Sequence, residues 1–293
     1  MVDEMRRIAY LGPENSYSFL AAKRIAHHSD VLADMPSFTD VLESVRDKRA
    51  DIAVIPMENS VEGNVNEVAD CLIFGDDKRP LYINAEFVLV IENHLIMRKD
   101  ADPNGIRTIV THWQPYAQCR QTLKRMLPNA RIVFAESTSA AVGSISDNVT
   151  AAIGGKQLAS EPYKISDSVI NDNKDNCTRF AVLSRNDFPD MKNNKLTIVF
   201  EAENKPGGLL RLLEIINVFG MNMTRLESRP HKSILGRYVF IADISGNVLD
   251  NSTSSALELM RRSTAHYKYL GCYEENSVIH SGTSERIGAE WPA

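Results

Sequence analysis

The stretch that decides the fold reads Ile52-Ala53-Val54-Ile55-Pro56-Met57-Glu58-Asn59-Ser60-Val61-Glu62-Gly63. Residues 52–56 form a short apolar run typical of a buried strand, and three polar side chains (Glu58, Asn59 and Ser60) follow it. Residues 66–72 then have a helical pattern. Polar residues at the end of such a strand lie where open α/β sheets bind their ligands. An ordinary capped loop fits the same residues, so both interpretations stay open.

The chain on both sides of this stretch alternates short apolar runs with amphipathic stretches. We expect strands at 8–11, 81–91, 108–111, 131–134, 151–153 and 179–183, and helices at 16–28, 38–48, 115–127, 137–147 and 156–160. The β-rich segment 81–91 separates two α/β cycles. Two such cycles predict an α/β region of two lobes with a cleft between them, which is a common place for a ligand site.

A polar, turn-rich segment, 186–195, is predicted to be a linker. Beyond it we expect strands at 196–202, 222–230, 235–244 and 267–274, and helices at 207–219 and 253–265. This βαββαβ order is typical of the ferredoxin-like α+β fold. Residues 276–293 contain few apolar side chains and are expected to be a poorly ordered tail.

Composition limits the classes of function. The 293 residues are enough for two domains, and 43% hydrophobic content can form a sizeable core. A net charge of -5 argues against a general nucleic-acid binder. The four cysteines are widely spaced without a C-x-x-C pair, so neither a metal site nor a disulfide framework is expected (Cys71, Cys119, Cys177 and Cys272).

The chain has no apolar run near the roughly 20 residues that a membrane-spanning helix needs. Residues 1–7 are charged and lack the apolar run of a secretory signal. We therefore expect a cytoplasmic protein that does not bind membranes.

Two further segments contain candidate site residues. Asn15 and Ser16 lie at an expected strand-to-helix turn, where they can cap the helix or offer free N–H groups to an anion. Thr178, Arg179 and Phe180 begin the last expected strand of the region. An arginine suits bidentate recognition of a carboxylate, although a Thr-Arg pair also occurs by chance.

Taken together, these motifs resemble those of prephenate dehydratases. The matching segments, in order, are Leu11-Gly12-Pro13, Pro56-Met57-Glu58-Asn59-Ser60 with Glu62-Gly63, Thr111-His112 with Gln114, Ala117-Gln118-Cys119, and Thr178-Arg179-Phe180. In the second domain, Pro206-Gly207-Gly208-Leu209 and Glu227-Ser228-Arg229-Pro230 look like the two signatures of the ACT domain fused to these enzymes. The resemblance covers residues 7–275 and, because no chorismate mutase segment is expected before the first strand, favours the monofunctional form.

The resemblance implies a catalytic region at 7–185 with two lobes, like a type 2 periplasmic-binding-protein fold, and an ACT domain at 196–275. It implies conversion of prephenate to phenylpyruvate without a metal or organic cofactor, with Thr178 as the central catalytic residue. Our hypothesis is that Thr178 donates a hydrogen bond or proton to the departing ring hydroxyl. Asn59, Ser60, Asn15 and Ser16 would then hold substrate oxygens, Arg179 would pair with a carboxylate, and Glu58 would orient nearby donors. Phe180, Thr111 and His112 complete the candidate substrate-binding set, although a lone histidine at a strand end, like His112, more often packs or caps a helix.

In the family, the two ACT signatures form an effector site at a dimer interface. The residues carried over to this site are Pro206, Gly207, Gly208, Leu209, Glu227, Ser228, Arg229 and Pro230. We expect phenylalanine as the effector and a homodimer or homotetramer. Both segments could instead be turns alone.

Two departures from the family pattern leave substrate preference open: Phe19 replaces a frequent histidine, and Trp113 a frequent proline. An arogenate dehydratase would use the same residues, and the motifs do not separate the two substrates. A non-catalytic bilobal ligand sensor is the alternative from a different class. A DNA-binding regulator would need a helix-turn-helix segment, and none is expected before residue 8.

Overall fold

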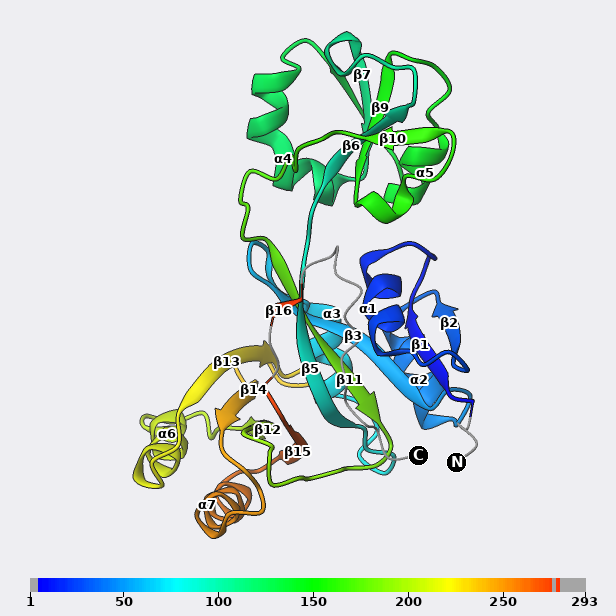
Figure 1. The fold of residues 1–293 in the computed structure, drawn as a ribbon. Coiled ribbons are helices and arrows are strands. Elements are labelled where there is room, and N and C mark those ends of the chain that lie inside the picture. Colours follow the sequence, from blue (N-terminus) through cyan, green and yellow to red (C-terminus); the bar gives the residue numbers. More distant parts are fainter. Residues whose placement is uncertain (1–4, 276–277, 280–293) are drawn as a thin grey trace.

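The computed structural model describes residues 5–275 and 278–279, which form two α/β lobes and a C-terminal α/β unit (Figure 1). The tail expected at 276–293 lies, apart from Val278–Ile279, outside the described residues.

The first lobe is built on a seven-stranded mixed sheet. Its strand order is β16 (Val278–Ile279), β5 (Tyr82–Val90), β11 (Cys177–Ser184), β3 (Ile52–Asn59), β1 (Arg7–Leu11) and β2 (Val31–Met35), with β4 (Gly63–Asn64) paired to β3. Helices α1 (Tyr17–Ile25), α2 (Phe38–Arg46) and α3 (Asn66–Ile73) pack beside this sheet. Strand β11 therefore lies in the middle of the sheet, antiparallel to β5 and β3, although it is the last of these three in the sequence.

The second lobe is a continuous insertion between β5 and β11. Its five-stranded sheet has the order β10 (Tyr163–Ile165), β6 (His94–Arg98), β9 (Thr150–Gly154), β7 (Thr108–Thr111) and β8 (Arg131–Phe134), with helices α4 (Trp113–Met126) and α5 (Thr138–Gly143) and 3₁₀ turns at Pro103–Gly105 and Lys156–Leu158. Residues 91–93 and 166–176 connect it to the first lobe. The two-lobe prediction is thus confirmed.

The C-terminal unit has the element order β12 (Lys195–Glu201), α6 (Gly208–Val218), β13 (Met223–Pro230), β14 (Tyr238–Ser245), α7 (Asn251–Arg262) and β15 (Tyr267–Tyr273). Its four-stranded sheet has the order β13-β14-β12-β15, which is the ferredoxin-like topology. Both helices cover one face of this sheet, and the other face packs on the first lobe.

One hydrophobic core joins the first lobe to the C-terminal unit. Ile83 and Leu72 of the first lobe are buried in the same cluster as Val199, Leu270 and Tyr273. The second lobe has separate clusters on the two sides of its own sheet. The first lobe and the C-terminal unit are therefore packed as one body, whereas the second lobe is attached through two connections.

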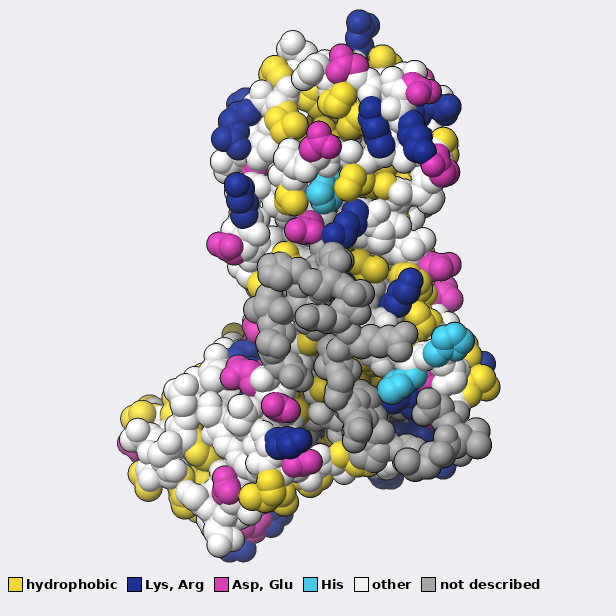
Figure 2. Space-filling view, viewed as in Figure 1, with side chains coloured by type: hydrophobic (Ala, Val, Ile, Leu, Met, Phe, Trp, Pro, Cys, Tyr) yellow, Lys and Arg dark blue, Asp and Glu magenta, His cyan; other side chains and the backbone are white. Residues whose placement is uncertain are grey.

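Several elements differ from the sequence-based expectations. Strands β2, β6 and β10 were not predicted, and each lies at or near a sheet edge where a short, interrupted apolar pattern suffices. The helix expected at 137–147 is only α5, and the helix expected at 156–160 is a single 3₁₀ turn. On the face shown in Figure 2, acidic and basic side chains of the described residues are interspersed rather than gathered into one basic surface.

Candidate active site

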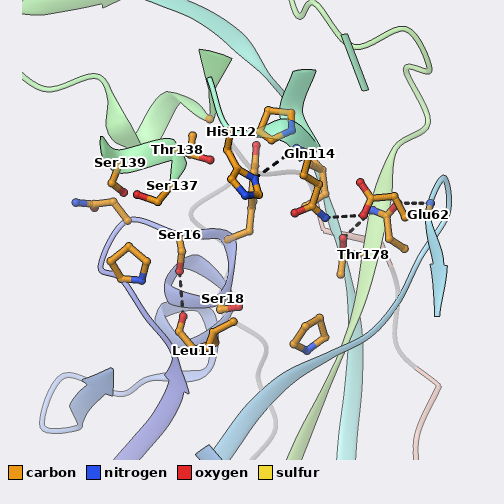
Figure 3. A pocket seen from close by; sticks show the side chains of 18 of the residues that line it. Leu11, Ser16, Ser18, Glu62, His112, Gln114, Ser137, Thr138, Ser139 and Thr178 are labelled. Carbon is orange, nitrogen blue, oxygen red and sulfur yellow. Dashed lines mark hydrogen bonds between the residues drawn. The ribbon is translucent and has the colours of Figure 1, made fainter. Parts of the chain in front are cut away.

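A cavity with a volume of about 620 Å³ lies between the two lobes (Figure 3). This volume lies within the range of small-molecule sites. Residues from both lobes line it, so a ligand bound there contacts both.

Two strands of the first lobe supply the base of the cavity. Thr178 and Phe180 of β11 and Asn59 of β3 line it, and Thr178 lies directly opposite Asn59 in the strand pairing. Successive side chains of a strand point to opposite faces of the sheet. Glu58 and Arg179, the neighbours of Asn59 and Thr178, consequently face away from the cavity.

The amide of Asn59 fixes the direction of the hydrogen bond to Thr178. Its Oδ1 accepts from the backbone N–H groups of Val61 (2.9 Å) and Glu62 (3.0 Å), which places the Nδ2 group on the other side. Nδ2 lies within hydrogen-bond distance of three acceptors, Asn176 Oδ1 (2.8 Å), Cys177 O (3.0 Å) and Thr178 Oγ1 (3.0 Å), and shares its two hydrogens among them. The threonine oxygen is thus an acceptor from Nδ2, and its own hydrogen is left to point toward the cavity.

A polar bridge links the lobes across the cavity mouth. Glu62 of the first lobe accepts hydrogen bonds from Gln114 Nε2 and Gln118 Nε2 of α4, both at 2.6 Å. Gln118 Oε1 in turn accepts from Asn176 Nδ2 at 3.0 Å, and Asn176 Oδ1 accepts from Asn59 Nδ2 at 2.8 Å. Thr178 is therefore connected through side-chain amides to the second lobe.

Our set of candidate site residues omitted Glu62, Gln114 and Gln118. A signal for the two glutamines is present in the sequence, because residues four apart lie on one face of a helix. Their common partner, Glu62, lies more than 50 residues earlier in the chain, so the sequence pattern did not indicate the bridge.

The position of His112 is compatible with both of the roles expected for it. It is the N-cap residue of α4, where its Nδ1 accepts from Gln114 N at 3.4 Å, and its ring also lines the cavity. A neutral ring that accepts at Nδ1 carries its proton on Nε2. Nε2 is then available as a donor.

Helix N-termini supply the positive end of the cavity. Asn15 has a left-handed backbone (φ 65°) and precedes Ser16, whose Oγ caps α1 by accepting from Phe19 N at 3.1 Å. The first turns of α1, α4 and α5 all line the cavity, whereas no Lys or Arg does among the described residues. Glu62 and Glu136 also line the cavity, so the partial positive charge of the helix N-termini is what favours an anion there, at the end of the cavity that these helices form. A further bond between the lobes, Gln157 Nε2 to Asn15 O at 3.1 Å, lies beside α1.

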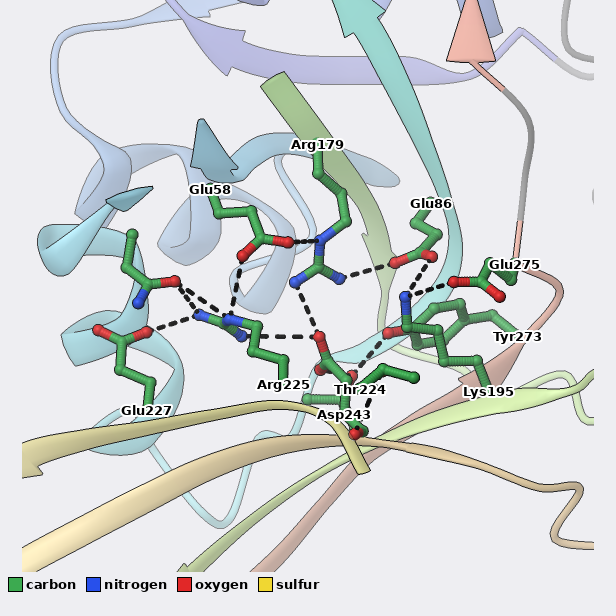
Figure 4. A network of polar contacts seen from close by, with 12 residues as sticks. Glu58, Glu86, Arg179, Lys195, Thr224, Arg225, Glu227, Asp243, Tyr273 and Glu275 are labelled. Carbon is green, nitrogen blue, oxygen red and sulfur yellow. Dashed lines mark hydrogen bonds and ion pairs between the residues drawn. The ribbon is translucent and has the colours of Figure 1, made fainter. Parts of the chain in front are cut away.

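The expected role of Arg179 is wrong, because its guanidinium lies in a buried ion-pair cluster outside the cavity (Figure 4). Nε donates to Glu58 Oε1 at 2.8 Å, Nη1 to Glu86 Oε2 at 2.7 Å, and Nη2 to Asp243 Oδ2 at 2.8 Å. Burial disfavours the charge of Arg179, but Asp243, Glu86 and Glu58 outweigh it and raise the arginine's pKa above its ordinary value. A guanidinium held by three carboxylates is not free to bind a substrate carboxylate.

Glu58, Ser60 and Thr111 also lie outside the cavity lining. Ser60 Oγ donates to Asp175 O (3.1 Å) and accepts from Cys177 N (3.0 Å), which anchors the start of β11. Thr111 is fully buried and donates to the carbonyl of His112 at 3.0 Å. These residues stabilise the strands and loops around the cavity and do not line it.

The candidate effector residues occupy two places in the C-terminal unit. Gly207 is the N-cap of α6 with a left-handed φ of 78°, and Pro206, Gly208 and Leu209 adjoin it. On β13, Ser228 and Pro230 are exposed.

The charged residues of the second signature contact the C-terminal unit and the first lobe. Arg229 Nε donates to Asp70 Oδ1 of α3 at 2.7 Å, and Glu227 pairs with Arg225 at 2.6 Å. Burial raises the pKa of Glu227 despite the arginines beside it.

Within residues 5–275 and 278–279, no group of three or more His, Cys, Asp or Glu side chains is placed to hold a metal ion. In the same part of the chain, no helix combines the length and apolar character needed to cross a membrane.

Comparison with known proteins gives one consistent family. A family model described as "Prephenate dehydratase" matches residues 8–188. The prephenate dehydratase of Amycolatopsis methanolica is 34% identical over 277 residues, which cover 92% of this chain and 88% of the relative. A solved prephenate dehydratase from Arthrobacter aurescens, in complex with L-Phe, is 30% identical with a TM-score of 0.83 over 92% of this chain and 90% of that one. A structure described as the quorum quenching acylase GqqA is 25% identical, with a TM-score of 0.80 over 92% of this chain and 98% of its own.

Proposed function

Because the chain belongs to the prephenate dehydratase family, we propose that it binds prephenate in the cavity between its lobes and converts it to phenylpyruvate, a step toward phenylalanine. The observation that best supports this proposal is the hydrogen bond from Asn59 Nδ2 to Thr178 Oγ1. It leaves the threonine hydrogen free to be donated to a leaving hydroxyl group.

The reaction needs one acid and a site for two carboxylates. The bond between the ring and its carboxylate breaks and releases CO₂, and the electron pair moves into the ring. The C–O bond at the opposite ring carbon breaks at the same time, and the departing hydroxide takes a proton to become water. The hydrogen of Thr178 is directed at this oxygen, and solvent finally replaces any proton that is transferred.

A threonine hydroxyl is a weak acid, so positioning must supply much of the rate. The bond from Asn59 polarises the hydroxyl and keeps its hydrogen toward the cavity, while the bridge from Glu62 to Gln114 and Gln118 holds the lobes around the substrate. Donors placed in advance at a position where negative charge develops are worth more in an enclosed site than in water.

The two substrate carboxylates are held by N–H donors, since no Lys or Arg lines the described part of the cavity. The backbone N–H groups in the first turn of α1 provide such donors from one lobe, whereas the hydroxyl of Ser16 itself donates to Leu11 O (3.3 Å). His112 Nε2 and the first turn of α4 provide them from the other. Anion binding of this kind depends on the closed arrangement of both lobes.

The proposal is tested by incubating the protein with prephenate and following phenylpyruvate, in the wild type and in Thr178→Ala. We expect kcat to fall by about 10² to 10⁴-fold, because the donor to the leaving group is lost, while KM changes little. Thr178→Ser is the matched control, since it keeps the hydroxyl opposite Asn59, and we expect it to retain much more activity. Wild-type turnover in Thr178→Ala would contradict the assigned role.

The same assay separates the alternatives. Arogenate, supplied in parallel, tests whether the amino-acid analogue is preferred. An N-acylated amine tests acylase chemistry, for which Thr178 lacks a base: its side-chain partner in the described chain, Asn59, is a donor. If neither prephenate nor arogenate is turned over, the non-catalytic sensor becomes the better interpretation.

We further propose that the C-terminal unit is an ACT domain at 196–275, joined to the catalytic region 7–185 by the linker 186–195, in a cytoplasmic enzyme. Its ferredoxin-like topology supports this assignment. The Arthrobacter aurescens enzyme was solved with L-Phe, which supports phenylalanine as the effector here. The glycine turn at Gly207–Gly208 and the exposed residues of β13 (Ser228 and Pro230) are the proposed effector-binding surface, completed by a second copy of the chain.

A further inference from the structure

A buried ion-pair cluster connects the strand of the catalytic threonine to the sheet of the C-terminal unit (Figure 4). It contains Arg179 of β11, Glu58 of β3, Glu86 of β5 and Asp243 of β14, and the carboxylates also pair with Lys195 of β12 and Arg225 of β13. We propose that Arg179 and Asp243 act as positioning residues: their ion pair holds β11 so that the hydroxyl of Thr178 meets the substrate.

The first argument is the place of Arg179 in its strand. Thr178 and Arg179 are consecutive residues of β11, so their side chains point to opposite faces of the sheet. Thr178 lines the cavity, and Arg179 extends toward the C-terminal unit. A displacement of the guanidinium is therefore transmitted to the threonine through a single peptide unit.

The second argument is how completely the cluster fixes its central arginine. Each of the three guanidinium nitrogens binds a different carboxylate, at 2.7–2.8 Å. Glu58 and Glu86 are on the two strands that flank β11, and Asp243 is on another unit altogether. The side chains of Arg179, Glu86 and Asp243 are at most 7% exposed, so solvent screens these pairs little.

The third argument is that hydrogen bonds from the neighbouring strands of the C-terminal sheet hold Asp243 in place. Its Oδ1 accepts from Thr197 Oγ1 at 2.8 Å, and Thr197 Oγ1 lies 2.7 Å from the hydroxyl of Tyr273. Thr197 and Tyr273 are fully buried on β12 and β15. A chain of polar contacts thus runs from β15 through β12 and β14 to the strand of Thr178.

The inference rests on the proposed function, because Thr178 must act on substrate for its position to matter. It goes further in one respect. Arg179, the residue next to Thr178, is assigned to the contact between the first lobe and the C-terminal unit and not to substrate binding. Any movement of β14 would be passed to Thr178 through Asp243 and Arg179.

The test compares Asp243→Asn with Asp77→Asn in the full chain. Asp243→Asn keeps the shape of the side chain and removes its charge from Arg179 (2.8 Å) and from the more distant Arg225 (3.8 Å). Asp77 also pairs with the C-terminal unit, through Lys268, but it is exposed and lies outside β3, β5 and β11, so it is the matched control. We would measure kcat and KM with prephenate, and deuterium uptake of the peptide that covers residues 177–184.

We expect Asp243→Asn to lower kcat by about 10- to 100-fold, since a small misplacement of a reacting group has effects of this size, and to change KM less than threefold. Deuterium uptake in β11 should rise at the same time. Asp77→Asn should leave all three quantities within about twofold of the wild type. Tyr273→Phe should also lower kcat and raise deuterium uptake in β11, but by smaller factors than Asp243→Asn. If Asp243→Asn folds poorly, Tyr273→Phe still tests the proposal.

Equal changes in Asp243→Asn and Asp77→Asn would overturn the inference, because they would indicate general loosening of the interface. Unchanged kcat together with unchanged uptake in Asp243→Asn or in Tyr273→Phe would overturn it as well. If the wild type itself does not turn over prephenate, the proposed function fails, and the deuterium uptake still shows whether the ion pair holds β11.

Discussion

The side-chain amide of Asn59 determines which way the proton of Thr178 points. Two backbone N–H groups hold its Oδ1, so that Nδ2 faces the threonine oxygen. An aspartate in this position would present an acceptor with the same shape. The threonine would then donate its hydrogen to the carboxylate and not to the substrate.

We therefore expect Asn59→Asp to lower kcat at neutral pH by about 10- to 100-fold, within the range for loss of a positioned donor. The matched control is Asn84→Asp, because Asn84 also donates an amide hydrogen to a hydroxyl (Ser184 Oγ, 2.8 Å) but lies on β5 away from the cavity. Its kcat should stay within about twofold of the wild type. Steady-state assays with prephenate would show whether the two variants differ; equal kcat values would refute this account of the hydrogen bond.

At the residue scale, the sequence indicates which side chains are chemically suited to the reaction, but not which face of the sheet each one occupies. Thr178, Asn59 and Ser16 line the cavity between the lobes. Arg179 does not, because its guanidinium pairs with Asp243, which lies 64 residues further along the chain. The presence of an arginine predicts a carboxylate partner. Whether that partner belongs to a substrate or to an aspartate of the protein is decided by tertiary packing, which the sequence pattern does not show.

The N-terminus of α6 depends on two consecutive glycines for different reasons. Gly207 has a left-handed φ of 78° and open space where a Cβ would lie, whereas a Cβ on Gly208 would lie 2.0 Å from the backbone oxygen of Glu203. The first glycine is required by its backbone conformation, and the second by a close approach of the preceding loop.

We expect Gly207→Ala to lower the free energy of unfolding by about 1–2 kcal/mol, the usual cost of an alanine in this conformation. Gly208→Ala should lower it further, because the oxygen of Glu203 belongs to the backbone and the loop must move as a whole. Urea unfolding of the two variants beside the wild type measures this order. A smaller effect in Gly208→Ala than in Gly207→Ala would show that the loop is free to shift.

At the element scale, the sequence predicts the long, strongly periodic elements and misses the short edge strands. The helix expected at 207–219 is observed as Gly208–Val218, since its apolar face and glycine start are both local signals. Strand β2, by contrast, is fixed by parallel pairing with β1, and its sequence Val-Leu-Ala-Asp-Met has little pattern of its own.

The backbones of the first lobe and the C-terminal unit approach each other closely at Gly271 of β15. A Cβ there would lie 2.2 Å from the backbone oxygen of Ile83 on β5, and the residue has a φ of 126°. The surrounding side chains belong to the hydrophobic core that the two parts share. Gly271→Ala should therefore lower the unfolding temperature of both parts together.

Differential scanning calorimetry of the full chain tests this expectation. Gly143→Ala is the matched control: Gly143 is in α5 of the second lobe, where a Cβ meets nothing within 4 Å, so alanine should be neutral or stabilise by about 0.5–1 kcal/mol. If Gly271→Ala leaves the unfolding temperature unchanged, the two backbones can separate without loss of the shared core.

At the scale of the whole molecule, the number of lobes and their order along the chain were predictable from the alternation of elements. The packing of the C-terminal unit on the first lobe was not. It depends on pairs such as Arg229 with Asp70 and Arg179 with Asp243, whose members are far apart in the sequence and carry no local pattern.

The position of β11 has a consequence for synthesis on the ribosome. This strand fills the middle of the first sheet, between β5 and β3, yet the ribosome makes it only after the entire second lobe, residues 94–165. Until then, β3 has an unpaired edge and β5 has no strand partner, because both neighbours of β5 in the sheet (β11 and β16) come later in the sequence, while the second lobe already has all its own strands and can fold. The strand that joins β5 to β3 also delivers Thr178 to the cavity, so a nascent chain becomes competent for catalysis only after β11 has been made and has paired with both.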